Sequence, residues 1–270
     1  MSWTGTDARA HLNLAVLGGQ PSLGDCFVKL APDLSLADWF TPWNTQALND
    51  ADADLGSGGA LLLPGSGLIV GGGKEGKLYV LDPGNLGHYC PACGNPLGDT
   101  QVIQWFKATG LKKGNQDPPP GKYHIHGSPV FWRSSGGGAR VYVMAEADWL
   151  RAFQFDGGKL TDTPVDISDV TTPGKSMPGG MLTLTAHGDQ DGTGIVWASH
   201  PVEGNDANQA VVPGMVRAID AGNLRRELWN SNMRAHDEVG LLAKFTPPTV
   251  VNGKAYLATF SNKICVYGLH

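Results

Sequence analysis

Three short apolar segments that follow one another within residues 125–156 limit most strictly what this chain can fold into. They read HGSPVFW, ARVYVMAE and WLRAFQFD, and a Gly-rich turn and then a tighter Asp-containing turn separate them. Runs of this length, rich in β-branched and aromatic residues and ended by Gly, Asp or Ser, are typical of strands joined by tight turns. The pattern therefore predicts an antiparallel meander.

The same pattern occurs three more times, at residues 57–82, 178–220 and 245–268. A fourth strand follows most copies, in the segments QVIQWFKAT, KLTDTPVDIS and LRRELWN. Four-strand units that repeat along a chain are the signature of a β-propeller. We therefore expect an all-β fold, a β-propeller of four-stranded antiparallel blades, with about five sheets of which the terminal ones are incomplete.

The two ends of the chain have complementary defects. The segments LNLAVLGG, DCFVKLA and LSLADWF predict the second, third and fourth strands of a blade, whereas the C-terminal copy predicts strands one to three. Propellers often build one blade from both ends, which hides open sheet edges. Two arrangements stay open: a ring with few blades, or an arc completed by a second copy of the chain as a homo-oligomer.

We expect residues 1–270 to form a single domain with a short lead-in at residues 1–12. Three irregular segments predict inserted loops, at residues 84–100, 110–122 and 202–214. The composition suits many turns around a core, since the chain has 38 Gly and 18 Pro but is 41% hydrophobic.

Charge and hydropathy exclude several classes of partner. The net charge of −5 argues against nucleic acid, which selects a basic face. The chain has neither an apolar run long enough to span a membrane nor a recognisable signal peptide. These features predict a soluble, cytoplasmic protein that acts on a small molecule.

The cysteines are too few for a disulfide scaffold. Cys90 and Cys93, in HYCPACG, are expected to form a loop disulfide or to be free thiols rather than half of a zinc knuckle. Cys26 and Cys265 are expected to be small buried residues.

Several motifs resemble one known group of propellers. They are VRAIDAGNLRRELWNS (residues 216–231), a degenerate LYVLDPGNLG, and the segments HIHGSPVFW, MPGGMLTLTAHG and AKFTPPTVVNGKAYLATFSN. Over nearly the whole length the chain resembles a bacterial branch of the quinoprotein-like (PQQ-like) β-propeller superfamily, apparently without several N-terminal blades. The redox members of that superfamily hold PQQ beside a vicinal disulfide and a calcium ion. This chain has no adjacent Cys pair, so the resemblance does not favour PQQ as a cofactor, and it leaves export open.

The loops that enter the first strands of a propeller converge on one face, which is the default ligand site. His124 and His126 precede such a strand, and in an extended segment they point to the same side, roughly 7 Å apart. That spacing suits one metal ion, with Asp54 as a further ligand and zinc or calcium as the ion. The alternative is a structural role, in which both histidines bond neighbouring backbone.

Other polar residues are expected at the same opening. Glu146, Asp237 and His236 are candidates for acid and base catalysis. Lys74 and Lys244 are candidates for stabilising an anion. The structural alternatives are ion pairs from Glu146 to Arg151 or Lys74, and from Lys244 to Asp237.

These residues favour a hydrolase of an ester, phosphoester or glycosidic bond, with metal assistance. A non-catalytic ligand-binding or assembly module is the alternative. A PQQ-dependent oxidoreductase is a third expectation.

Overall fold

The computed structural model describes residues 23–94, 98–174 and 177–268. The lead-in expected at residues 1–12 and the strand expected in LNLAVLGG lie outside the described residues. The all-β prediction is confirmed: the structure consists of several small antiparallel sheets with a few short helices. Of the helices in the described ranges, none is long and apolar enough to cross a membrane.

The chain forms two compact units, one ending at Lys107 and the other beginning at Ala108. In the first unit a meander of the expected kind has the order β3-β4-β5-β7. A second sheet has the order β1-β2-β6, in which β6 lies in the predicted inserted loop and pairs with β2 in parallel. The strands are β1 (Phe27–Leu30), β2 (Leu36–Thr41), β3 (Leu61–Leu62), β4 (Ile69–Gly72), β5 (Lys77–Leu81), β6 (His88–Tyr89) and β7 (Gln104–Lys107).

Three short helices complete the described part of the first unit: α1 (Thr45–Asp50), η1 (Leu55–Ser57) and η2 (Pro91–Gly94). Aromatic side chains fill the space between the two sheets. Phe27 and Phe40 from one sheet pack with Ile69 and Tyr79 from the other, and Trp105 covers this cluster. Aromatic packing between the two sheets thus forms a core of this unit.

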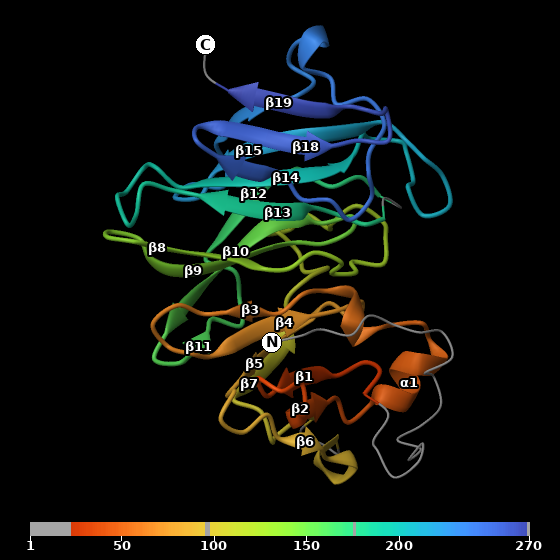
Figure 1. The fold of residues 1–270 in the computed structure, drawn as a ribbon, viewed down its shortest axis with the longest axis vertical. Coiled ribbons are helices and arrows are strands. Elements are labelled where there is room, and N and C mark those ends of the chain that lie inside the picture. Colours follow the sequence, from red (N-terminus) through yellow and green to blue (C-terminus); the bar gives the residue numbers. More distant parts are fainter. Residues whose placement is uncertain (1–22, 95–97, 175–176, 269–270) are drawn as a thin grey trace. The chain divides into compact units, whose positions relative to one another are not determined.

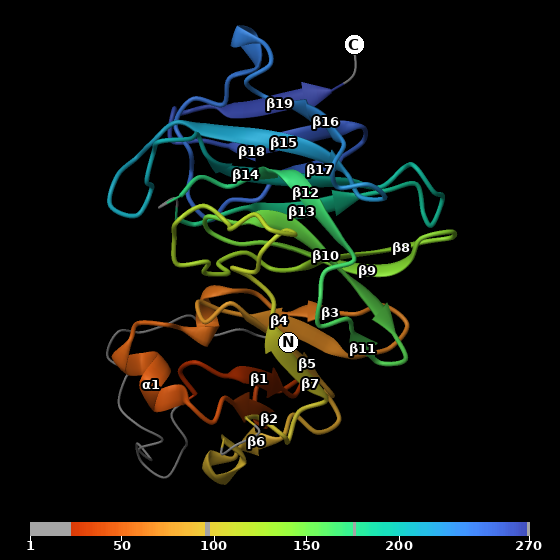
Figure 2. The same cartoon turned by 180° about the vertical axis from the view of Figure 1, so that it is seen from behind.

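The second unit contains three sheets that follow one another in chain order (Figures 1 and 2). The first has the order β11-β10-β9-β8, and β12 pairs with the other half of β10, so the fourth-strand position is divided between two short strands. The second has the order β13-β14-β15-β16, and the third has three strands, β17-β18-β19.

The strands of the second unit agree with the predicted meanders. β13 packs against β8 and β9 on one side and against β17 on the other, so the first strands of the three sheets are neighbours. The elements are β8 (Val130–Ser134), β9 (Gly138–Met144), β10 (Trp149–Asp156), β11 (Lys159–Leu160), β12 (Asp166–Thr171), β13 (Met181–Thr185), β14 (Ile195–Pro201), β15 (Gly214–Asp220), β16 (Glu227–Asn230), η3 (Ala235–Asp237), β17 (Thr249–Val251), β18 (Lys254–Ala258) and β19 (Ile264–Gly268).

Side chains from facing sheets form the core of this unit. Trp132 and Tyr142 pack with Leu182 and Val196 between the first and second sheets. Trp197, Trp229 and Tyr267 surround the cluster between the second and third sheets. Tryptophans thus pack between neighbouring sheets of this unit.

A candidate metal site in the second unit

The His124–Ile125–His126 segment leads into β8, and its side chains alternate as expected of extended backbone. Ile125 is buried, with an exposed fraction of 1%. The two imidazole rings lie on the other side, and their centroids are 5.6 Å apart. The predicted convergence of the two histidines is therefore present in the structure.

Glu146 lies in the turn between β9 and β10 and faces both histidines. Its backbone N–H donates to the carbonyl of His124 at 3.0 Å, which joins the turn to the histidine segment. Its carboxylate oxygens lie 3.2 Å from Nε2 of His126 and 3.6 Å from Nδ1 of His124. The side chains of His126, Glu146 and His124 are 2%, 9% and 16% exposed, so His124 faces the more open side.

These three side chains could hold a metal ion. One donor atom from each lies within 4.8 Å of the other two. Four ligands about 2.0–2.1 Å from a tetrahedral zinc ion are separated from one another by about 3.3 Å, which is close to the two histidine–carboxylate distances. Two imidazole nitrogens and one carboxylate oxygen suit zinc, whereas calcium takes oxygen ligands. Glu146, expected as an acid or base, is thus grouped with the two histidines expected as metal ligands.

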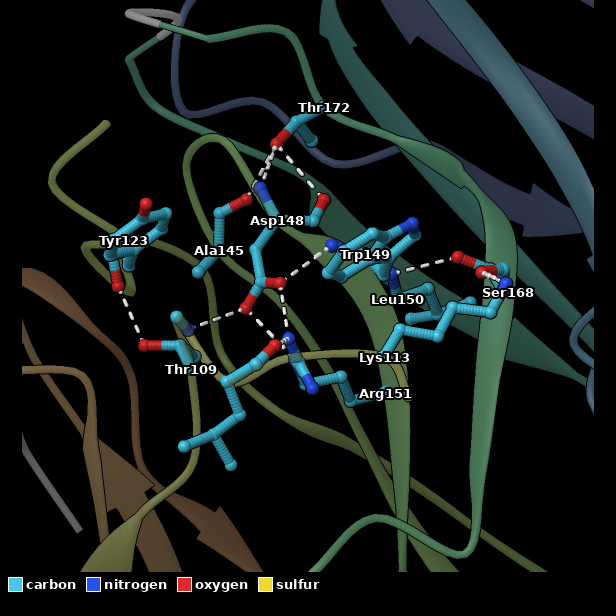
Figure 3. Close-up of polar contacts among 12 residues, drawn as sticks. Thr109, Lys113, Tyr123, Ala145, Asp148, Trp149, Leu150, Arg151, Ser168 and Thr172 are labelled. Carbon is cyan, nitrogen blue, oxygen red and sulfur yellow. Dashed lines mark hydrogen bonds and ion pairs between the residues drawn. The ribbon is translucent and has the colours of Figure 1, made fainter. Parts of the chain in front are cut away.

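A fully buried ion pair fixes the turn that carries Glu146. The side chains of Asp148 and Arg151 are both 0% exposed, and Nη2 of Arg151 lies 2.6 Å from Oδ1 of Asp148 while its Nε donates to Oδ2 at 2.9 Å. Thr172 donates its hydroxyl to the carbonyl of Ala145 and accepts the backbone N–H of Asp148 (Figure 3). Arg151 therefore pairs with Asp148, and the structural alternative of a Glu146–Arg151 pair is wrong.

The same network holds the segment that leads to the histidines. The backbone N–H of Gly110 donates to Asp148 at 2.9 Å, and Arg151 donates to the carbonyl of Leu111. The hydroxyl of Thr109 donates to the carbonyl of Tyr123 at 2.7 Å, one residue before His124 (Figure 3). Because buried charges must be paired and hydrogen-bonded, these contacts restrict both backbone segments to one arrangement.

Three residues with unusual backbone conformation border the group. Tyr123, Ala147 and Phe245 have positive φ values of 61°, 49° and 66°. Tyr123 and Ala147 adjoin His124 and Glu146 in sequence, and the Phe245 ring lies 5.9 Å from the His126 ring. A left-handed conformation costs a non-glycine residue roughly 1–2 kcal/mol and persists only where the surroundings impose it. Such strain is typical of functional sites.

The chain matches no protein-family model and no curated protein.

Two of the expected site residues lie in the first unit and pair with each other. Nζ of Lys74 lies 2.5 Å from Oδ2 of Asp54 and 3.0 Å from Asp52. Burial lowers the pKa of Lys74, but the hydrogen bonds and charges of the two aspartates outweigh this effect and leave the pKa raised. The metal-capable group of His124, His126 and Glu146 lies in the second unit, so Asp54 as a further ligand and a Glu146–Lys74 pair stay predictions.

The remaining expected residues lie in the second unit. His236 and Asp237 form η3, where Nε2 of His236 lies 3.4 Å from the Asp237 carboxylate and Trp229 donates to the same carboxylate. Nζ of Lys244 donates to the carbonyl of Asn208 at 3.0 Å, so its expected alternative partner, Asp237, is engaged elsewhere.

The cysteines behave partly as expected. Cys90 and Cys93 form a disulfide in the first unit, which was one of the two expected outcomes. Cys26 is a buried thiol, whereas Cys265 is only half-buried because it lies in the edge strand β19.

Sequence reasoning missed Phe245 and the Asp148–Arg151 network. Nothing in the segment KFTPP marks Phe245 as having positive φ. The network could have been suspected from Arg151, a charged residue that follows Trp149 and Leu150 in the mostly apolar strand WLRAFQFD.

Proposed function

We propose that His124, His126 and Glu146 bind a divalent metal ion, with zinc fitting best, and that the protein is a metal-assisted hydrolase. The observation that carries this proposal is the approach of three buried or half-buried donor groups from separate segments to within 4.8 Å of one another. Three protein ligands leave one position of a tetrahedral ion open, as in catalytic rather than structural zinc sites.

The protein groups have distinct tasks in this proposal. The two imidazoles and the carboxylate hold the ion. The Asp148–Arg151 network fixes the position of the turn that carries Glu146 relative to the segment that leads to the histidines. A bound zinc ion makes a coordinated water nucleophilic at neutral pH and polarises a carbonyl or phosphoryl oxygen. Lys244 supplies positive charge for an anion on the substrate. Glu146, as a ligand, is not the free base.

We also propose that the sheets are blades of a propeller. The support is the recurrence of the four-strand meander and the contact of β13 with both β8 and β17, because first strands are neighbours around a propeller axis. In that arrangement the turn carrying Glu146 and the segment entering β8 lie at one end of the blade, as the contacts between Glu146 and the histidines require.

Metal binding is tested first. Protein stripped with a chelator is titrated with Zn²⁺ and analysed for bound metal, beside the variants His126→Ala and Glu146→Gln. We expect one equivalent of zinc on the parent, and more than roughly 100-fold weaker binding by each variant, since even outer-shell partners change metal affinity by roughly 10–100-fold. His187→Ala is the matched control, because His187 is exposed and bonds only to its own loop in the described structure.

Hydrolysis is tested on the same samples with panels of nitrophenyl esters, phosphoesters and glycosides. We expect turnover that disappears in the chelated protein and in Glu146→Gln and returns to the parent with Zn²⁺. Failure of the parent to bind zinc would refute the metal site. Zinc binding without turnover on any panel would refute the hydrolase and leave a ligand-binding site.

A further inference from the structure

Phe245 is an exposed aromatic residue held beside the candidate metal group. Its exposed fraction is 47%, its φ is 66°, and its ring centroid lies 5.9 Å from that of His126 at an interplanar angle of 56°. Exposure of a large apolar ring and a left-handed backbone are both unfavourable. The chain nevertheless holds the ring next to a metal-binding side chain.

Neighbouring strands fix this conformation. The hydroxyl of Ser199 in β14 donates to the carbonyl of Thr246 at 2.6 Å. The hydroxyl of Thr183 in β13 donates to the carbonyl of Pro248 at 2.5 Å. The backbone on the C-terminal side of Phe245 is thus tied to two strands of the preceding sheet, so that the aromatic ring is a preorganised surface rather than a mobile one.

Lys244 adds a positive charge at the same place. Its Nζ lies 5.5 Å from the centroid of the Phe245 ring and donates to the carbonyl of Asn208. Within the described ranges no carboxylate oxygen lies within 4.0 Å of this Nζ, so its charge is not neutralised by an ion pair. Phe245 therefore lies near both the His126 imidazole and the ammonium group of Lys244.

We propose that the ligand of this site is an organic anion with a flat apolar body, resting on the proposed metal site. One polar group of the ligand binds the metal, the apolar body lies against the Phe245 ring, and an anionic group pairs with Lys244. Aromatic contacts and a partly exposed ion pair each contribute modestly, so the class of ligand is recognised by their combination.

Three carboxylate probes, tested on zinc-loaded protein, separate the contribution of the Phe245 ring from that of Lys244. Terephthalate has a ring and two carboxylates, succinate has two carboxylates without a ring, and benzoate has a ring and one carboxylate. By isothermal titration calorimetry we expect terephthalate to bind about fivefold more tightly than succinate, the range of one aromatic contact. We expect terephthalate to bind about fivefold more tightly than benzoate. This factor combines the contribution of a partly exposed ion pair with a statistical factor of about two for two equivalent carboxylates.

Two variants test which residue causes the preference for terephthalate over succinate and which causes the preference over benzoate. Phe245→Leu keeps an apolar side chain but should abolish the preference for terephthalate over succinate. Lys244→Gln should reduce the preference over benzoate to about twofold, the statistical factor for two equivalent carboxylates. Phe260→Leu and Lys254→Gln are matched controls, because both residues are exposed in the same part of the chain, and they should keep both preferences.

Zinc affinity is measured on every variant, so that the two proposals fail in different ways. If the parent binds no zinc, the metal site fails and the ligand proposal falls with it. If zinc binds but terephthalate binds no more tightly than succinate and benzoate, or if Phe245→Leu and Lys244→Gln retain the parent preferences, the ligand proposal alone is refuted.

Discussion

His200 predicts how the second unit responds to acid. It is 1% exposed within β14, and burial, followed by the charge of Arg217, lowers its pKa from 6.5 to about 3. Its Nδ1 lies 2.7 Å from the carbonyl of Pro201, and its Nε2 accepts from Nε of Arg217 at 2.9 Å. The ring is therefore neutral and protonated on Nδ1, and no lone pair remains for an added proton.

The sign and size of the effect follow from proton linkage. Between pH 6.5 and 3 the unfolded chain binds a proton at His200 that the folded chain does not bind, so the free energy of unfolding rises with pH in this window. One proton corresponds to about 1.4 kcal/mol per pH unit. Acidification by two pH units below 6.5 should therefore remove about 3 kcal/mol of stability through this residue alone.

The measurement compares the parent protein with His200→Asn at several pH values. Asn retains a donor for the carbonyl of Pro201 but does not titrate, and the carboxylate of Glu227, which pairs with Arg217, is common to both proteins. Hydrogen exchange of β14 peptides in increasing urea gives the local free energy of opening. We expect the parent to lose more stability than the variant on acidification. Parallel pH profiles for the two proteins would refute the burial of a neutral imidazole.

Three further predictions concern the described residues. Asp148→Asn should cost about 3–5 kcal/mol by chemical denaturation, because it leaves the charge of Arg151 buried and unpaired, and a loss below 1 kcal/mol would contradict this. Ala147→Gly should stabilise the protein by about 1 kcal/mol by relieving a positive φ, and an unchanged midpoint would argue against strain. Burial raises the pKa of Cys26 to about 12, so a thiol reagent at pH 8 should label half-buried Cys265 first; equal rates would contradict this.

The sequence predicted those parts of the structure that depend on local patterns. The meander of β8, β9 and β10 follows from alternating apolar residues and from turns rich in Gly or Asp, both of which are visible within a few residues. The same alternation placed His124 and His126 on one side of an extended segment with Ile125 on the other. Two-residue periodicity was sufficient to predict two of the three residues of the metal-capable group.

The features that could not be predicted depend on contacts between distant segments. Helix α1 has six residues, too few for a periodic pattern to indicate it. The short strand β6 forms only because β2 offers a parallel edge to a loop. Arg151 is buried where Asp148 and the carbonyl of Leu111 accept hydrogen bonds from its Nε and Nη2, and strand patterns alone do not reveal such partners.

The surroundings of Glu146 show what its residue type alone could not predict. A carboxylate in an apolar turn suits general acid or base chemistry by residue type, and that was the expectation. Its two oxygens face one imidazole each, at 3.2 and 3.6 Å, so the carboxylate is grouped with two histidines rather than alone in an apolar turn. Residue type was sufficient to predict that Glu146 is a site residue. Its position beside the two histidines depends on the backbone hydrogen bond to His124 and on the buried Asp148–Arg151 pair, which join segments distant in sequence.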